Sequence, residues 1–224
     1  MPTARYDGQT TWYDAFASAD VFTSAREQAV HFLGLGPGSC LDLGCGTGRA
    51  IPLLTRAGWK VVGTDVSADQ LAAAREHAGH LAEDLVQADA HNLPFADGAF
   101  DAVASILTHT DFDDLGAVFR EVHRVLRTGG TFAYVGVHPC FASPSVEPRE
   151  DGPALLHPGY REAGWQRVSR NPDKPGIRAR VGINHLPLAA LLNAAIEGGF
   201  ALTELAEPGD TDPPLFLGFR AVKR

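Results

Sequence analysis

From residue 39 onward, the order of hydrophobic and polar residues alternates between two kinds of segment. Short apolar runs of about four to seven residues, typical of buried strands, are followed by segments in which apolar residues recur at helical spacing. The expected strands are Cys40–Leu43, Lys60–Asp65, Leu85–Asp89, Asp101–Ile106 and Thr131–Val137, and the expected helices are Ala50–Ala57, Ala68–Ala78 and Asp113–Arg127. Strands that alternate with helices in this way predict an α/β domain with a parallel sheet.

Helical and strand patterns also flank this core. Two short helices are expected within Gln9–Leu33, and one more within Leu186–Glu197. Two further apolar runs, Phe200–Ala206 and Leu215–Val222, have no helix between them, which implies an antiparallel pair. The chain is therefore expected to close with two neighbouring antiparallel strands.

The periodic pattern breaks from His138 to Ile183. Seven of the fifteen prolines lie in this stretch, and no long helix is predicted. Such an insertion after a core strand is either a substrate lid or a loosely ordered excursion, and we favour the lid. Its second half is basic, and either receives an acidic group of a substrate or forms a solvated surface; the basic residues are Arg161, Arg167, Arg170, Lys174, Arg178 and Arg180.

The first strand leads into a glycine-rich turn, S-C-L-D-L-G-C-G-T-G-R, at Ser39–Arg49. Glycines at alternate positions lack the Cβ atoms that would keep a ligand away from the backbone, and the next helix directs free N–H groups over the turn. Two nucleotide-binding patterns fit poorly. A P-loop requires a lysine after the glycines, and the dinucleotide pattern G-x-G-x-x-G requires a third glycine where Arg49 stands.

Acidic residues lie near the ends of the first three strands. Asp42 precedes the glycine turn, Asp65 ends the second strand and Asp89 ends the third. Asp65 lies about 20 residues beyond the turn, the spacing at which an acidic side chain accepts hydrogen bonds from ribose hydroxyls. Because ligands of open α/β sheets bind outside the carboxyl ends of the strands, we expect the three residues to converge on one crevice.

The segment L-D-L-G-C-G-T-G, with Asp65 and Asp89 at these distances, resembles the class I S-adenosylmethionine (SAM)-dependent methyltransferases. The resemblance covers about residues 36–223 apart from the insertion. It implies a seven-stranded Rossmann-like methyltransferase sheet, mostly parallel with the last strand antiparallel, and helices on both faces. It also implies SAM as the cofactor and S-adenosylhomocysteine as its product.

The resemblance assigns roles to individual residues of the crevice. It implies that Asp42 supports the methionine part of the cofactor, that Asp65 binds its ribose, and that Asp89 and Ala90 meet its adenine. The other cofactor-binding residues it implies are Gly44, Cys45, Gly46, Gly48, Val66 and Ser105. N-terminal helices close over the cofactor in similar enzymes, so Tyr6 and Tyr13 either cap it or pack in the core.

Composition narrows the class of protein. The 224 residues carry a formal net charge of -8, which argues against a general nucleic-acid binder. The three cysteines have neither disulfide nor zinc-site spacing and suit a reducing cytoplasm. With no signal-like N-terminus and no long apolar run, we expect a cytoplasmic protein that binds neither a membrane nor nucleic acid. The choice between monomer and homodimer stays open.

Two histidines are candidates for a general base, which would add roughly 10² to 10⁴-fold to the rate if the acceptor must lose a proton. His109 follows the fourth strand at the mouth of the expected crevice, and His138 follows the fifth. The alternative for either is a loop histidine bonded to backbone or packed near the cofactor. Asp111, Asp113 and Asp114 are explained more simply by helix capping than by metal binding, so we expect no metal.

The leading hypothesis is a methyltransferase that transfers the SAM methyl group to a small molecule by in-line displacement. Three alternatives stay open: a SAM-binding protein of this fold with no methyl transfer or another SAM-assisted reaction, an NAD-dependent oxidoreductase, and methylation of protein or RNA. We expect a single domain over residues 1–224. Its parts are cap helices at 1–35, a cofactor-binding core at 36–137, the lid at 138–183 and a C-terminal helix and strand pair at 184–224.

Overall fold

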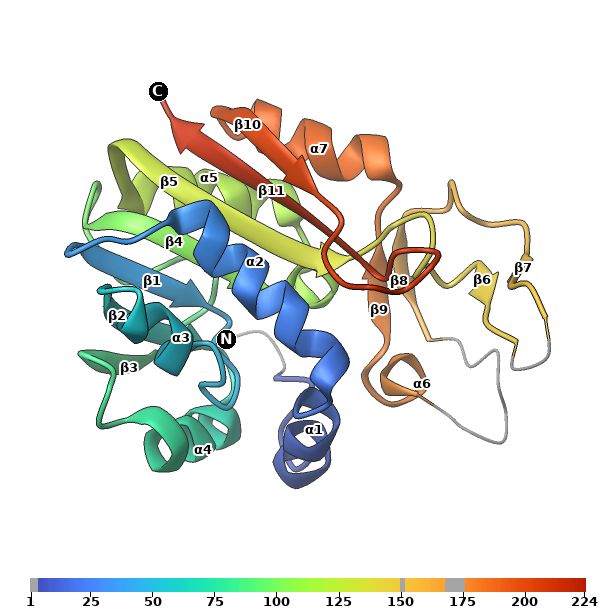
Figure 1. Ribbon diagram of the computed structural model, residues 1–224, viewed down its shortest axis with the longest axis horizontal. Helices are drawn as coiled ribbons and strands as arrows, with labels where there is room; N and C mark the ends of the chain where they lie inside the picture. Colours follow the sequence, from blue (N-terminus) through green and yellow to red (C-terminus); the bar gives the residue numbers. More distant parts are fainter. Residues whose placement is uncertain (1–3, 150–151, 168–175) are drawn as a thin grey trace.

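The computed structural model describes residues 4–149, 152–167 and 176–224, and it is built on one large sheet (Figure 1). The strands are β1 (Ser39–Leu43), β2 (Lys60–Asp65), β3 (Asp84–Gln87), β4 (Phe100–Ile106), β5 (Leu126–Val137), β10 (Phe200–Ala206) and β11 (Phe216–Lys223). Their order in the sheet is β10-β11-β5-β4-β1-β2-β3. The first five are parallel, whereas β11 is antiparallel to both of its neighbours. The predicted seven-stranded, mostly parallel sheet with an antiparallel last strand is confirmed.

Helices cover both faces of the sheet, as predicted. Cys40 of β1 lies in a buried cluster with α2 (Thr23–Leu33), α3 (Ile51–Arg56) and α4 (Ala68–Ala78). Leu41 and Leu43 point to the opposite face and pack in a second cluster with α5 (Leu115–Val125) and α7 (Leu188–Glu197). Because both faces of the central strands are buried, their sequences are nearly continuous apolar runs.

Two strand ends differ from the prediction by more than one residue, for local reasons. The third strand ends at Gln87, because Asp89 leaves the sheet to accept a hydrogen bond from the Asn92 N–H (2.9 Å) in a tight turn. The fifth strand begins at Leu126, where the backbone turns directly from α5 into extended conformation. The residues predicted to end the helix therefore belong to the strand.

Helix α4 begins in a way that matters for the crevice. The pattern S-x-x-Q from Ser67 predicts a reciprocal capping box, and only one half of it forms. The Ser67 hydroxyl accepts from the Gln70 N–H (3.2 Å), but the Ser67 N–H donates to the Asp65 carboxylate (2.9 Å) instead of the Gln70 side chain. The helix start therefore holds Asp65 in place at the end of β2.

The insertion after β5 contains only short elements. They are β6 (Val146–Glu147), β7 (Leu155–Leu156), β8 (Gly164–Gln166), α6 (Ile177–Val181) and β9 (Ile183–His185), and the strands form two antiparallel pairs. Arg170 and Lys174 of the predicted basic stretch lie outside the described residues. Within the described ranges, none of the helices has the length and apolar character needed to span a bilayer.

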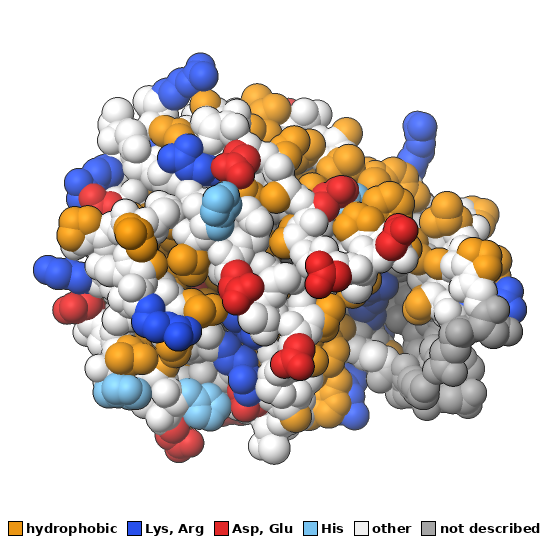
Figure 2. Space-filling view, in the orientation of Figure 1, with side chains coloured by type: hydrophobic (Ala, Val, Ile, Leu, Met, Phe, Trp, Pro, Cys, Tyr) orange, Lys and Arg blue, Asp and Glu red, His pale blue; other side chains and the backbone are white. Residues whose placement is uncertain are grey.

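The parallel strands of the sheet point toward the insertion and the N-terminal elements. Figure 1 shows α1 (Thr10–Ala17) and the insertion on the side that the arrowheads of β1 and β5 face. The short helices η1 (Asp20–Phe22) and η2 (His109–Asp111) complete this side. Hydrophobic side chains gather on the part of the surface that carries the insertion (Figure 2). The crevice predicted at the strand ends is therefore enclosed by segments from both halves of the chain.

Candidate functional site

Two adjoining cavities lie at the carboxyl ends of the parallel strands. The larger has a volume of about 400 Å³ and the smaller about 90 Å³, and we call them the large and the small cavity. Four residues line both: Tyr6, Tyr13, Gly44 and Leu107. The two cavities therefore meet between the glycine turn and the N-terminal segment.

The glycine turn allows the backbone to approach its neighbours closely. Gly44, Gly46 and Gly48 all have positive φ, which other residues resist. A Cβ on Gly44 would lie 2.5 Å from Cγ2 of Thr108, so only glycine fits there. Gly48 lines neither cavity; its missing Cβ lets the turn pack on α4. Of the predicted glycines, Gly44 and Gly46 thus face the cavities, whereas Gly48 has a packing role.

Asp42 lies beneath this turn and lines the large cavity. Its side chain is only 2% exposed, and its Oδ2 has no hydrogen-bond partner among the described residues. Burial, reinforced by the charge of Asp65, raises the pKa of this carboxyl to about 7, and Arg26 opposes the shift. A buried acceptor without a donor is costly, so Asp42 is prepared for a cationic or N–H-bearing ligand group.

Asp65 is fixed at the floor of the small cavity by backbone donors. Its carboxylate accepts from the Gly46 N–H and from the Ser67 N–H, both at 2.9 Å. Burial raises the pKa of Asp65, while these hydrogen bonds pull it down. Val66 lines the same cavity. The second strand and the glycine turn are therefore tied together at the point where ribose binding was predicted.

Asp89 lines the small cavity together with Ala90. Its Oδ1 accepts from the His91 N–H (2.9 Å) and bonds Nδ1 of the His91 ring (2.7 Å). Nε2 of the same ring accepts from the Asp114 N–H (3.3 Å), so the proton of a neutral His91 sits on Nδ1 and is donated to Asp89. This leaves the second oxygen of Asp89 for a ligand.

The N-terminal segment covers the junction of the two cavities. The rings of Tyr6 and Tyr13 meet edge to face with centroids 4.9 Å apart. The Tyr6 hydroxyl donates to Asp111 at 3.1 Å, whereas the Tyr13 hydroxyl forms no hydrogen bond within the described residues. Burial raises the pKa of both phenols, so both stay protonated. Tyr6 and Tyr13 lie in the position predicted for a cap.

Three acidic residues near α5 have three different roles. Asp114 caps the helix by accepting from the Ala117 N–H (2.9 Å), as predicted. Asp111 instead lines the small cavity and accepts from Tyr6, and burial raises its pKa to about 7. Asp113 accepts from Arg5 (2.8 Å) and from the Trp165 indole of the insertion. Sequence reasoning missed Asp111 as a site residue because a D-x-D-D run before a helix also has the signature of a cap.

The helix α1 is fastened to the glycine turn by a carboxylate. Asp14 accepts from the hydroxyl of Thr47 (2.8 Å) and from Nε of Arg49 (2.9 Å), and it forms a salt bridge with Nη2 of Arg49. Arg49 is the residue that stands where a dinucleotide fingerprint would have its third glycine. An arginine at the position where a dinucleotide-binding turn has glycine is the signal in the sequence that this turn has a charged partner.

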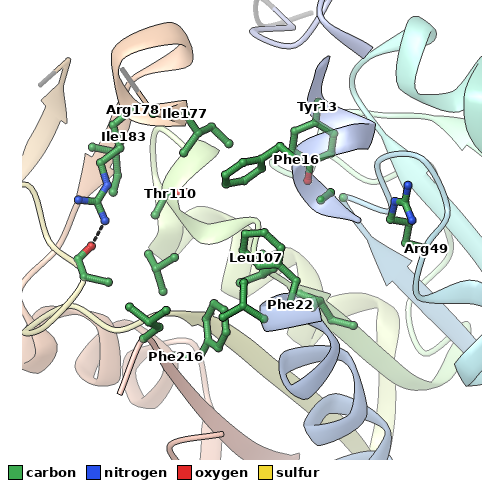
Figure 3. Close-up of a pocket in the computed structure, with 18 of the residues that line it drawn as sticks. Tyr13, Phe16, Phe22, Arg49, Leu107, Thr110, Ile177, Arg178, Ile183 and Phe216 are labelled. Carbon is green, nitrogen blue, oxygen red and sulfur yellow. Dashed lines mark hydrogen bonds between the residues drawn. The ribbon is translucent and has the colours of Figure 1, made fainter. Parts of the chain in front are cut away.

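The wall of the large cavity is mostly apolar (Figure 3). Phe16 and Phe22 come from the N-terminal elements, Ile177 and Ile183 from the insertion and Phe216 from β11. Arg178 also lines the cavity, but its guanidinium donates to the carbonyls of residues 142 and 143. No pattern in the sequence predicts this wall, because the residues that form it lie far apart along the chain.

At the centre of this wall, Leu107 lies between the two cavities. It follows β4 with φ 62°, and it is the only residue other than glycine with positive φ within the described ranges. A leucine in the left-handed region is strained, and such strain is typical of functional sites. The turn at Leu107 directs the chain from the sheet into η2.

The predicted base His109 lines neither cavity. Its side chain is buried, the ring meets Tyr134 edge to face at 5.4 Å, and Nδ1 has no partner within the described residues. Burial, with His185 nearby, lowers the pKa of His109 to about 3. The ring fits beside Gly136, where a Cβ would lie 2.3 Å from Nδ1. This placement argues against a role as the base.

Of three other predicted site residues, two lie outside both cavities and one lines the large cavity. His138 lines neither cavity; its Nε2 bonds Glu207 (2.8 Å) and its Nδ1 accepts from the Cys140 N–H (3.1 Å), so it fastens the insertion to the C-terminal hairpin. The buried Ser105 lines neither cavity, and its hydroxyl bonds Thr108 of the small cavity wall (2.6 Å). Cys45 does line the large cavity. In the described parts of the chain, no three His, Cys, Asp or Glu side chains gather as a metal site.

Known proteins resemble this chain over part or nearly all of its length. A family model described as a methyltransferase domain matches residues 41–134. A malonyl-[acyl-carrier protein] O-methyltransferase of Pectobacterium atrosepticum is 36% identical over 126 residues, which are 54% of this chain and 47% of that protein. A demethylmenaquinone methyltransferase of Corynebacterium kroppenstedtii is 41% identical over 90 residues, 40% of this chain and 38% of that protein. The chain thus matches less than half the length of these two relatives.

A solved structure covers nearly the whole chain. The SAM-dependent methyltransferase of Mesorhizobium loti matches with a TM-score of 0.70 and 26% identity, over 97% of this chain and 99% of that one. The match includes the insertion and the N-terminal helices, which the family model does not reach.

Proposed function

Because the chain belongs to the class I SAM-dependent methyltransferase family, we propose that it transfers the methyl group of SAM to a small molecule held in the large cavity. SAM is the cofactor of this family. The observation that carries the proposal is the unpartnered oxygen of Asp42 beneath a glycine turn, next to a second cavity lined by Asp65 and Asp89. An acceptor cavity and a cofactor cavity that meet at four shared residues are what a transfer between two bound molecules requires.

The residues present fit each part of the cofactor. Asp65 would accept from the ribose hydroxyls, and Asp89 from the adenine amino group, with Val66 and Ala90 beside it. Asp42 would accept from the methionine ammonium, and the cationic Arg26, which also lines the large cavity, would hold the methionine carboxylate. A cationic partner also explains why an acid is kept at a buried position that disfavours its charge.

The chain contributes mainly position and exclusion of water. When bound, SAM supplies a methyl group activated by a sulfonium. Gly44, Leu107 and Tyr13 line the junction, so they are suited to hold the acceptor close to the methyl group and in line for displacement. Orientation of this kind can lower a barrier by on the order of 7 to 11 kcal/mol. Since neither His109 nor His138 lines a cavity, this proposal uses no histidine base.

The cellular setting is part of the same proposal. The three cysteines are free thiols, which supports a reducing compartment such as the cytoplasm. The two curated relatives are named for demethylmenaquinone and for malonyl-[acyl-carrier protein], so their names do not by themselves select the acceptor of this chain.

Calorimetric titration with SAM, S-adenosylhomocysteine and NAD tests the proposal. We expect micromolar affinity for the first two and none for NAD. Labelled SAM incubated with the protein and candidate acceptors should then yield S-adenosylhomocysteine and a labelled product in equal amounts. Binding of NAD alone would reject the proposal, and tight SAM binding with no transfer to any acceptor would favour a SAM-binding protein without methyl transfer.

A further inference from the structure

The charged groups on the wall of the large cavity already have partners. Arg49 is paired with Asp14, and Arg178 donates to the carbonyls of residues 142 and 143. Arg26 donates to the Ala17 carbonyl and faces Asp42, where the proposed cofactor would bind. No cation is therefore left on the described wall to receive an anionic group of an acceptor.

The hydroxyl groups of the wall divide into two kinds. The Tyr6 hydroxyl donates to Asp111, and the Thr47 hydroxyl donates to Asp14. The hydroxyls of Tyr13 and Thr110 form no hydrogen bond within the described residues, although both side chains line the large cavity. Figure 3 shows the two on different parts of the wall, Tyr13 on α1 and Thr110 on η2. Because burial keeps the Tyr13 phenol protonated, it has a proton to donate.

The rest of the wall is aliphatic and aromatic. The side chains of Phe16, Phe22, Ile177 and Phe216 surround the space in Figure 3. Transfer of an ionised group from water into such surroundings is strongly unfavourable unless a partner compensates it, whereas apolar surface gains about 25 cal/mol per Å² buried. A wall of this kind therefore favours uncharged molecules with few polar atoms over charged or highly polar ones.

We infer that the methyl acceptor is an uncharged, largely apolar molecule with a single polar end, and that the hydroxyls of Tyr13 and Thr110 hold its polar atoms. The inference rests on the proposed function, because it takes the large cavity as the acceptor site. Tyr13 lies at the junction with the small cavity, so its hydroxyl orients the polar end toward the cofactor. The basic residues of the insertion that the sequence suggested for an acidic substrate are not needed in this assignment.

Three bicyclic probes of one shape test the inference: naphthalene, 2-naphthol and 2-naphthoate. They are titrated at pH 7 into protein saturated with S-adenosylhomocysteine, so that the cofactor site is filled. The cavity of about 400 Å³ would take the methionine end of S-adenosylhomocysteine at Asp42 and Arg26 as well as a probe, and about 150 Å³ is enough to admit benzene. We expect 2-naphthol to bind about 2- to 10-fold more tightly than naphthalene, and 2-naphthoate to bind at least about tenfold more weakly than 2-naphthol.

Matched variants identify the hydroxyls. Tyr13→Phe and Thr110→Val should each reduce the preference for 2-naphthol over naphthalene and leave naphthalene affinity unchanged. Tyr134→Phe removes a buried phenol outside both cavities, and Thr11→Val removes an exposed hydroxyl from the same helix as Tyr13; both should keep the preference. Thermal melting and S-adenosylhomocysteine affinity show that each variant is folded.

The outcomes separate the inference from the function it rests on. If S-adenosylhomocysteine does not bind, the proposed function itself fails. If it binds, the inference is overturned when 2-naphthoate binds as tightly as 2-naphthol, when none of the probes binds, or when neither cavity variant alters the preference. Loss of the preference in Tyr13→Phe and Thr110→Val, with both controls unchanged, supports the inference.

Discussion

The two cavities are built by opposite means. The small cavity is formed at the ends of consecutive strands, where Asp65 and Asp89 follow short apolar runs and Gly46 follows β1. The large cavity is assembled from the N-terminal elements, the insertion and β11, which lie up to about two hundred residues apart. A cofactor shared by a whole family needs the same polar groups each time, so local motifs encode its site. An acceptor cavity needs only the right shape and charge, so many sequences can form it.

The residues that line the two cavities also differ in their effect on the free energy of folding. Asp42 and Asp111 are buried carboxyls whose pKa values rise to about 7, so the ligand-free protein holds them at a cost. Asp42 lines the large cavity at its cofactor end and Asp111 lines the small one, whereas the rest of the large cavity contributes apolar surface and paired charges, which carry no such penalty. Binding of the proposed cofactor should therefore stabilise the protein more than binding of an acceptor.

The largest effect should come from Asp65→Ala. The substitution removes the proposed acceptor for the ribose hydroxyls and also the acceptor for two backbone N–H groups of the turn and α4. We expect SAM affinity to fall by about 2 to 3 kcal/mol, roughly 30- to 150-fold, by calorimetry. Glu76→Ala, an exposed acid on α4, is the control. An unchanged affinity would reduce Asp65 to a structural residue.

Asp42→Asn should separate the stability of the free protein from its affinity for SAM. The pKa of Asp42 is about 7 in the folded protein and 3.8 in the unfolded chain. Its stabilising contribution to the folded state is therefore complete below pH 3.8 and is lost as the pH rises through 7. At pH 8 we expect the ligand-free variant to gain about 2 kcal/mol in urea unfolding, after the unsatisfied amide is allowed for. SAM binding should weaken about tenfold.

The control for this comparison is Asp210→Asn, which changes an exposed acid. It should alter neither the unfolding free energy at pH 8 nor SAM affinity. A variant at position 42 that is less stable than the natural protein at pH 8, and equally so at pH 4, would show that Asp42 is satisfied without a ligand.

His109→Leu tests a residue that belongs to neither cavity. The pKa of His109 is about 3 in the folded protein and 6.5 in the unfolded chain. The contribution of this histidine to the free energy of unfolding is therefore present above pH 6.5 and is lost as the pH falls toward 3. Between pH 7.5 and 5.5 the natural protein should lose about 1 to 2 kcal/mol of unfolding free energy relative to the variant. His80→Leu, at an exposed position, should follow the natural protein. Loss of SAM affinity in His109→Leu would place this ring in the cofactor site after all.

The smallest effect is expected on the acceptor side, from Trp12→Ala. The Arg180 guanidinium of the insertion lies 4.4 Å from the centroid of the Trp12 ring, which also stacks on Phe16 of the cavity wall. Losing this cation–π contact should weaken 2-naphthol binding about 2- to 5-fold, or about 0.5 to 1 kcal/mol. S-adenosylhomocysteine affinity should stay within about twofold, and Leu35→Ala, an exposed apolar site, should change neither. Equal losses for both ligands would mean that the cavities are not separable.

The sequence predicted the sheet and the floor of the small cavity because both follow from short-range pattern. Apolar runs of strand length define β1 to β5, and the parallel arrangement brings Asp42, Asp65 and Asp89 to one edge. Side-chain direction in the loops is a different matter. His109 is on the expected loop, but its ring turns into the space left by Gly136, and nothing in the local sequence reports that space.

Residues that act through distant partners were equally beyond sequence reasoning. Asp111 becomes a site residue because Tyr6 of the N-terminal segment contacts it. Asp113 is likewise contacted by Arg5 of that segment and by Trp165 of the insertion. The wall of the large cavity depends on the same kind of meeting. Such contacts become visible once the tertiary structure brings the segments together.

The fastening of α1 to the glycine turn by Asp14 has a kinetic consequence. The segment it anchors carries Tyr6 and Tyr13, which cover the small cavity and form part of the wall of the large one. We expect exchange of the cofactor to require this segment to lift, which would open the large cavity as well. We therefore expect the opening rate of this segment to set how fast the ligands exchange.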